Sequence, residues 1–342
     1  MLTAMKLPAV CLALLLGFST LPAFARNHNP PAQSIFDFHS GFWVNLHHFL
    51  YLEALTERPE EARRPASLST EDLTALRALT PQEHVLWDEA VAYYAHSMIQ
   101  RDLLFDRDLI ATQIALEDAE ASSDLGGTEL APELKSVLQK AAPIYRNHWW
   151  PMHYRKNRAW IQQLEPLIGR YGDSLKNSLA KICETPWQTE PVRVDMVMYA
   201  NWAGAYTTVG PTRVTISASE PANPEAGALE TVFHESSHAL VDKMRAAIDE
   251  AAAVENAHRT GPPFQSGNIW HAVLFYTAGA LVAQQIPGYV PFADRGGLWK
   301  RAWPDPDRAL TAADWQPHID GRTGLQPSLA KLVSDLASQH AP

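Results

Sequence analysis

Hydrophobic residues recur at helical spacing through most of the first half of the chain. An aromatic-rich stretch at 36–55 is predicted to open a helix at Gly41, and a charged connector with prolines follows at 58–69. Further patterns in which apolar positions three and four residues apart share one face lie at 70–79, 81–105, 132–141 and 148–171. This half is therefore predicted to consist of helices joined by turn-rich segments.

The pattern changes after residue 185. Two stretches, 192–200 and 213–219, alternate apolar and polar residues as strands do. The segment between them contains two glycines and a proline. We predict that both stretches belong to a small antiparallel sheet.

A long helix is predicted next, from about 224 to 254. Asn223 is a suitable N-cap residue, and Pro224 suits the first helical position. After a break at 260–267, the pattern predicts one helix at 268–285 and a last one near 327–337.

The order of these elements predicts an α+β fold that is mainly α. We expect a helical domain at 26–185, packed against a second domain at 186–342 that holds the sheet and the long helix. A chain of 342 residues, with 46% hydrophobic and 19% charged residues, suits two domains or one large bilobal domain.

The first 25 residues have the features of a secretory signal peptide. A single positive charge, Lys6, precedes an apolar run at 7–18, which is too short to span a bilayer. Ala23-Phe24-Ala25 then matches the small-residue cleavage pattern, so we expect cleavage after Ala25 and a periplasmic or secreted protein. An uncleaved anchor is the alternative. No later segment is apolar for long enough to predict a membrane span in the mature form.

The charge of the chain limits the classes of partner that we expect, and its cysteine content limits the disulfides. Without the leader, 27 basic residues face 38 acidic ones, a net charge of −11. This balance disfavours nucleic acid and anionic membrane surfaces as partners. Cys183 is the single cysteine after the leader, so no internal disulfide is expected.

The candidate chemistry lies inside the predicted long helix. His234 and His238 are four residues apart, so both imidazoles project from one helix face toward a single point. Glu235 follows the first histidine and stands beside that point, where it could accept a proton from water. The pattern is the HExxH motif of zinc sites, and apolar neighbours argue against two solvated surface histidines.

This arrangement resembles the zincin metallopeptidases, and the order of strands, HExxH helix and second helix at 192–285 is closest to the gluzincin side of that group. The resemblance implies His234 and His238 as zinc ligands and Glu235 as the general base. The chain departs from the gluzincin pattern because the second helix, 268–285, contains no glutamate. It is also similar to uncharacterised exported bacterial proteins with an HExxH helix and a segment like 270–279.

A catalytic zinc takes three protein ligands, and we favour His271 as the third. It is the one metal-capable side chain of the second helix, and a helical hairpin would return it toward the motif. The alternatives lie on the connecting segment: Glu255, Glu250, Asp249 and His258. If Glu255 is the ligand, His271 becomes an electrostatic catalyst.

Other polar residues are candidates for supporting roles. Glu230 and Asp242 lie one turn from the motif histidines, where a carboxylate could orient a ligand imidazole. Tyr276 is the predicted oxyanion donor, with Tyr206 and Tyr199 as alternatives.

Two weaker patterns are set aside. Gly172-Asp173-Ser174-Leu175 spells a GDSL lipase motif, but it follows a helical pattern and its Asp-x-x-His partner is missing. The pairs His47-His48 and His148/His153 are expected to be packed or surface histidines.

These observations predict a zinc-dependent hydrolase, a metallopeptidase acting on a peptide or protein substrate, with Zn²⁺ as cofactor. The strand at 213–219 could offer its edge to an extended peptide. The alternatives are a metal-dependent amidase or esterase acting on a cell-envelope or small-molecule substrate, and a catalytically inactive zincin-fold binding protein.

Overall fold

The computed structural model describes residues 34–221, 223, 225–303 and 305–339. The predicted signal peptide, its cleavage site after Ala25 and Pro224 lie outside these residues. Within the described part, no helix is both long enough and apolar enough to cross a membrane. The fold is α+β and mainly α, which confirms the predicted class.

Four strands form one mixed sheet. They are β1 (Phe36–His39), β2 (Val192–Val197), β3 (Ala205–Thr208) and β4 (Arg213–Ser217). Their order is β1-β2-β4-β3, and β1 and β4 both run parallel to β2, while β3 is antiparallel to β4. The prediction of an antiparallel sheet is therefore wrong for β2 and β4. The chain reverses twice between them, once on each side of β3, so β4 runs in the same direction as β2.

The helices of the first half begin at recognisable caps. Ser69 with Asp72 and Thr80 with Glu83 form capping boxes, and Asp106 accepts hydrogen bonds from the first turn of the next helix. The helices are α1 (Phe42–Glu57), α2 (Thr70–Arg77), α3 (Pro81–Ser97), α4 (Arg107–Asp118), α5 (Pro132–His148) and the 3₁₀ turn Pro59–Glu61. The predicted helix at 81–105 thus ends at Ser97, and α4 was not predicted.

One hydrophobic core surrounds α1, which is buried on nearly every face. Aromatic rings dominate it: Trp87 stacks on Trp149 with ring centroids 4.6 Å apart, and Phe49 packs against both. Even His47 and His48 are buried here, where His47 contacts the hydroxyl of Tyr94. Of the two positions that the sequence allowed for His47 and His48, packed or at the surface, the structure shows the packed one.

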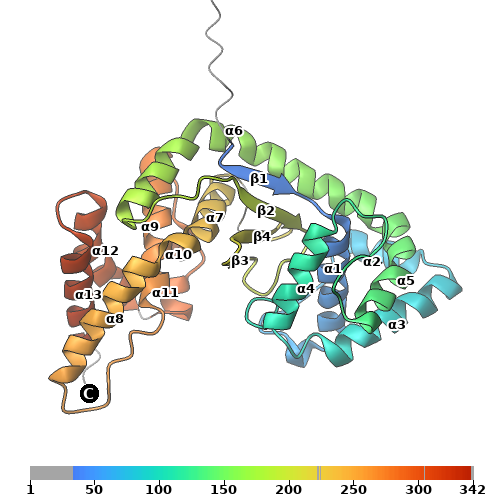
Figure 1. The fold of residues 1–342 in the computed structure, drawn as a ribbon, viewed down its shortest axis with the longest axis horizontal. Coiled ribbons are helices and arrows are strands. Elements are labelled where there is room, and N and C mark those ends of the chain that lie inside the picture. The colour runs from blue at the N-terminus through green and yellow to red at the C-terminus, as the bar shows by residue number, and fades with distance from the viewer. Residues whose placement is uncertain (1–33, 222, 224, 304, 340–342) are drawn as a thin grey trace, which may run out of the picture. The chain divides into compact units, whose positions relative to one another are not determined.

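A second hydrophobic core lies between the sheet and the remaining helices. The 33-residue α6 (Trp150–Ile182) runs past the sheet and contacts α5, the motif helix α7 and α9 (Figure 1). Ser174 lies inside α6, so the GDSL sequence forms no turn. The other helices are α7 (Ala226–Ser237), α8 (Asp242–Ala257), α9 (Ile269–Gln285), α10 (Phe292–Arg295), α11 (Leu298–Arg301), α12 (Asp305–Ile319) and α13 (Leu325–Gln339). The predicted division at residue 185 stays a prediction.

The predicted long helix is divided in the structure. α7 ends at Ser237, a 3₁₀ turn follows at His238–Leu240, and α8 starts at Asp242. The hydroxyls of Ser236 and Ser237 donate to backbone carbonyls four residues earlier, at 2.7 and 2.6 Å. Such bonds compete with the helical ladder, which explains why the regular helix ends here.

The predicted N-cap is also wrong. α7 begins at Ala226, after Glu225 in a positive-φ conformation. Asn223 instead accepts a hydrogen bond from the hydroxyl of Thr231, at 2.9 Å. Its side chain therefore ties the approach segment to the second turn of the helix.

Candidate metal centre

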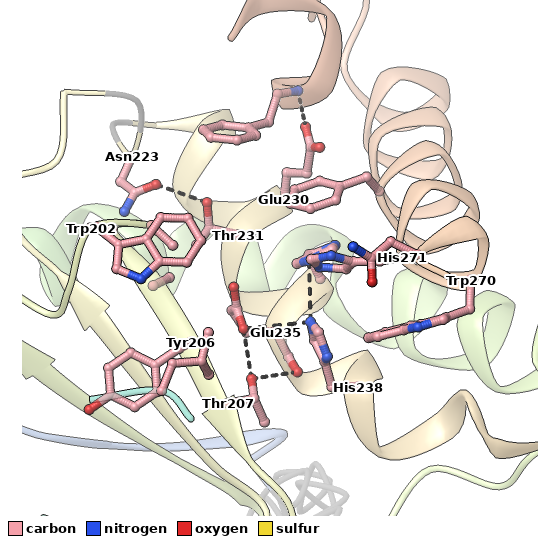
Figure 2. A pocket seen from close by; sticks show the side chains of 18 of the residues that line it. Trp202, Tyr206, Thr207, Asn223, Glu230, Thr231, Glu235, His238, Trp270 and His271 are labelled. Atoms are coloured by element: carbon pink, nitrogen blue, oxygen red, sulfur yellow. Dashed lines mark hydrogen bonds and ion pairs between the residues drawn. The ribbon is translucent and has the colours of Figure 1, made fainter. Parts of the chain in front are cut away.

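Three histidines come together at the contact between α7 and α9. His234 and His238 come from the motif, and His271 comes from the first turn of α9. Figure 2 shows His238 and His271 close together, with Glu235 beside them. One ligand atom from each histidine lies within 4.8 Å of the others. The Nε2 atoms of His234 and His238 are 3.4 Å apart. The structure thus assembles the three ligands that the sequence favoured.

Aromatic packing fixes the rings. His234 stacks on Phe275, with ring centroids 3.7 Å apart, and His271 stacks on Trp270 at 4.9 Å. Both aromatic residues lie on α9, close to His271 in the sequence, so the first two turns of this helix supply one candidate ligand and the rings that support two of them. Nδ1 of His234 is buried with no hydrogen-bond partner among the described residues, so stacking is what orients this ring.

The three imidazoles are neutral at ordinary pH. Burial lowers the pKa of His238 to about 3 and that of His271 to about 4, and positive charge on neighbouring groups adds to the effect. The pKa of His234 is lowered well below its usual value, first by burial and then by the other two histidines. Arg245, whose guanidinium lies 4.4 Å from the Trp270 ring, contributes for His238 and His271. Neutral imidazole is the form that binds metals.

The residues fit a zinc ion. With zinc–nitrogen bonds of about 2.0–2.1 Å and tetrahedral angles, two ligand nitrogens lie about 3.3 Å apart. The separation of 3.4 Å between the Nε2 atoms of His234 and His238 agrees with this geometry, while the set that includes His271 lies within a wider limit of 4.8 Å. Three neutral imidazoles would leave one position of a four-coordinate zinc for water, as in catalytic zinc sites.

Glu235 lies beside the histidines and is only 7% exposed. Its Oε2 atom is 3.8 Å from Nε2 of His238. The hydroxyl of Thr207 in β3 is 2.8 Å from both this Oε2 and the backbone oxygen of Glu235. Burial raises the pKa of Glu235 to about 7, partly offset by the Thr207 hydrogen bond. Sequence reasoning missed Thr207, because its strand is only four residues long and lies in a segment interpreted as a linker.

The alternative ligands lie elsewhere. Asp249 accepts a hydrogen bond from Ser266, and Glu250, Glu255 and His258 lie along or just after α8. Among the described residues, the only group of three or more metal-capable side chains found close together is the histidine cluster. The structure therefore favours His271.

Among the described residues, neither Glu230 nor Asp242 forms the predicted hydrogen bond to a motif imidazole. Glu230 is buried, and its Oε2 accepts hydrogen bonds from the Tyr289 hydroxyl at 2.5 Å and the Phe292 backbone N–H at 2.9 Å. Asp242 opens α8, beyond the turn that carries His238. Glu230 therefore anchors the segment before α10 to the motif helix.

The predicted oxyanion donor Tyr276 is wrong. Its hydroxyl donates to Gln316 at 2.8 Å, and the residue does not line the cavity at the histidines. Five residues along a helix correspond to a rotation of about 140° relative to His271, which turns Tyr276 away. Tyr206 lines the cavity, but its hydroxyl donates to Gln113 and points away from the histidines in Figure 2. Tyr199 packs against the first core.

The histidines open into a cavity of about 430 Å³. Its walls come from four parts of the chain: the segment after α3, the loop and strand around β3, the motif helix, and the first turns of α9 with α10. The described residues that line it include Glu235 and Glu230 but no lysine or arginine. Aromatic and other apolar side chains share the lining with polar ones, which include Asn223, Thr231 and Asn268 as well as the groups at the histidines.

The free edge of the sheet is not the predicted one. β4 pairs with β2 on one side and with β3 on the other, so the segment 213–219 has no open edge over the strand. The edge strand on this side of the sheet is β3, whose Ala205, Tyr206 and Thr207 line the cavity.

Comparison with known proteins found no matching family model, no matching curated protein and no matching solved structure.

Proposed function

We propose that this chain is a zinc-dependent hydrolase, and more narrowly a metallopeptidase. One observation carries the proposal: three neutral imidazoles, one buried and two half-buried, converge within 4.8 Å beside a buried carboxylate. His234, His238 and His271 would hold the ion. Bound there, zinc would supply Lewis-acid polarisation of a substrate carbonyl and would make water more acidic.

Glu235 supplies the proton chemistry. As the carboxylate it can accept a proton from water, and as the acid it can return that proton to a leaving nitrogen. Burial favours the acid form by raising its pKa in the metal-free protein. Thr207 holds one carboxylate oxygen, so the group does not have to be ordered again in each cycle. These roles need no titrating group other than Glu235.

The edge strand β3 supports a peptide substrate. Ala205, Tyr206 and Thr207 of this edge strand line the same cavity as Glu235, so an extended peptide in the cavity could add to the sheet. The proposal places the protein in the periplasm or outside the cell, on the basis of the predicted signal peptide.

A second candidate is an amidase or esterase for a small substrate. The cavity volume of about 430 Å³ supports it, because this lies toward the lower end of the range of about 300–1,000 Å³ for small-molecule sites. An inactive binding protein with the same fold is the third possibility, and Glu235 separates it from both enzymes.

The test compares metal content with turnover. Wild-type protein should retain about one zinc per chain and hydrolyse members of a quenched fluorescent peptide library. Glu235→Gln should keep the zinc and lose at least about a hundredfold in turnover, whereas His234→Ala should lose both. Glu250→Gln, an exposed change on α8, is the matched control.

Each alternative has its own outcome. Hydrolysis of small esters or amides without cleavage of any peptide would favour the second candidate. Protein that retains no zinc, or a Glu235→Gln variant with full activity, would end the hydrolase proposal.

A further inference from the structure

Phe105 has an unusual position for a large apolar residue. Its side chain is 65% exposed, yet it lines the cavity of the candidate metal centre. None of the other large apolar residues exposed in the described chain, Val85, Tyr154, Val209, Val254 and Val290, lines this cavity. Single exposed apolar residues are common, but one at the mouth of a cavity marks a place where a ligand can cover it.

Trp202 stands near Phe105 and is held rigidly. Its indole N–H donates to the carboxylate of Asp102 at 2.9 Å, and its backbone oxygen accepts from Arg64 at 2.8 Å. Arg63 also pairs with Asp102, at 3.3 Å, and its guanidinium lies 5.2 Å from the Trp202 ring and 5.7 Å from the Phe105 ring. Together with Leu104, these two rings form what we call the aromatic rim (Leu104, Phe105 and Trp202).

The loop behind Trp202 is fixed as well. Gly204 has a φ of +85°, and a Cβ there would lie 2.9 Å from the Glu220 side chain. The Ala203 N–H donates to the Asn201 side chain at 2.8 Å. The hydrogen bonds of Asn201 and Trp202 hold the ring in one orientation, so it gives a ligand a preorganised surface.

The other wall of the cavity is also aromatic. Trp270, Phe275 and Phe292 line it, and the first two support the ligand histidines. A substrate reaching Glu235 therefore passes between this wall and the aromatic rim. No basic side chain among the described lining residues could balance an anionic group there.

We propose that the aromatic rim binds a large apolar side chain of a peptide substrate, next to the bond that is hydrolysed. This inference rests on the proposed function and specifies its substrate class. Phe105 and Trp202 select the side chain, while Glu235 and the histidines act on the backbone.

The experiment measures binding in the absence of turnover. Zinc-loaded Glu235→Gln protein is titrated with fluorescein-labelled pentapeptides in which one position at a time is Phe, Leu, Gly, Asp or Lys, with fluorescence anisotropy as the readout. At one position, the Phe and Leu peptides should bind about tenfold more tightly than the Gly peptide, which corresponds to about 1.4 kcal/mol. Adding Phe105→Ala should remove most of this preference and leave the Gly peptide unchanged.

Val85→Ala is the matched control, since Val85 is 58% exposed on α3 and does not line the cavity. Equal weakening of the Phe and Gly peptides by Phe105→Ala, the absence of any apolar preference, or the failure of every peptide to bind would overturn the inference. Turnover of peptides without apolar preference would refute this inference alone. Phe105-dependent binding by a wild-type protein that hydrolyses nothing would instead refute the proposed hydrolase.

Discussion

The assignment of His271 as the third ligand can be tested through stability. His271 is partly exposed at the start of α9, and its contacts are the rings of Trp270, Phe275 and the two other histidines. Replacing it by alanine should therefore change the free energy of unfolding of the metal-free protein by no more than about 1 kcal/mol. The substitution should have a far larger effect on the stabilisation that added zinc gives to the folded protein.

The expected magnitude follows from mass action. A ligand that binds only the folded protein stabilises it by about 2.7 kcal/mol when its free concentration is a hundred times its Kd. For a chain of this size, each kcal/mol corresponds to about 2 °C in Tm. Zinc should therefore raise the Tm of the wild-type protein by about 5 °C. At the same zinc concentration, His271→Ala should show little or no increase.

The assay is thermal unfolding of metal-free protein with and without zinc, followed by calorimetry or tryptophan fluorescence. His258→Ala is the matched control, because His258 is an exposed histidine after α8 and was a competing ligand on sequence grounds. It should retain the full shift. A zinc shift that survives His271→Ala but disappears in His258→Ala or Glu255→Gln would refute the arrangement described above.

Three further predictions test other parts of the structure. Thr207→Val should lower kcat for peptide hydrolysis about tenfold with little change in KM, because it frees the Glu235 carboxylate, and Thr207→Ser should restore it. Burial raises the pKa of Glu53 to about 8 in the folded protein, although Trp87 donates to it. The folded state thus binds more protons than the unfolded state between about pH 4.5 and 8, and stability should fall across this range by up to about 1.4 kcal/mol per pH unit. Urea unfolding of Glu53→Gln should show a smaller fall, because the buried carboxyl of Glu235, with a pKa raised to about 7, contributes a fall of its own. Phe233→Ala should lower the free energy of unfolding by about 3–5 kcal/mol in the same assay, since the fully buried ring packs 5.1 Å from that of Phe36; a loss below 1 kcal/mol would contradict the packing described.

The metal-capable residues could be predicted because their placement depends on local geometry. Helical spacing alone brings His234 and His238 to one face, and an antiparallel helix pair returns His271 to it. Local geometry alone does not fix the direction of the Tyr276 side chain, because that direction depends on how α9 is rotated about its own axis relative to its neighbours. Its contact with Gln316 of α12 belongs to a helix that the sequence pattern did not predict.

The elements and residues that the sequence did not predict depend on contacts between parts of the chain that are far apart in the sequence. β1 has four residues and becomes a strand only by pairing with β2, far along the chain. β3 is equally short, so Thr207 had no visible role before the strand was placed against α7. The apolar residues after Ser97 resemble a continued helix, and only the side chain of Asp106 marks the start of a new one.

The burial of polar groups on α7 is itself an argument about function. Glu230, His234 and Glu235 are all at least nine-tenths buried, and both the Oε1 of Glu230 and the Nδ1 of His234 have no hydrogen-bond partner among the described residues. Such groups destabilise a fold, and apolar residues of similar volume would stabilise it. A helix that served only packing would not contain them. A cation that binds the folded state alone recovers part of this cost through linkage. A cation held by the three imidazoles would therefore contribute both to the stability of the protein and to its proposed chemistry.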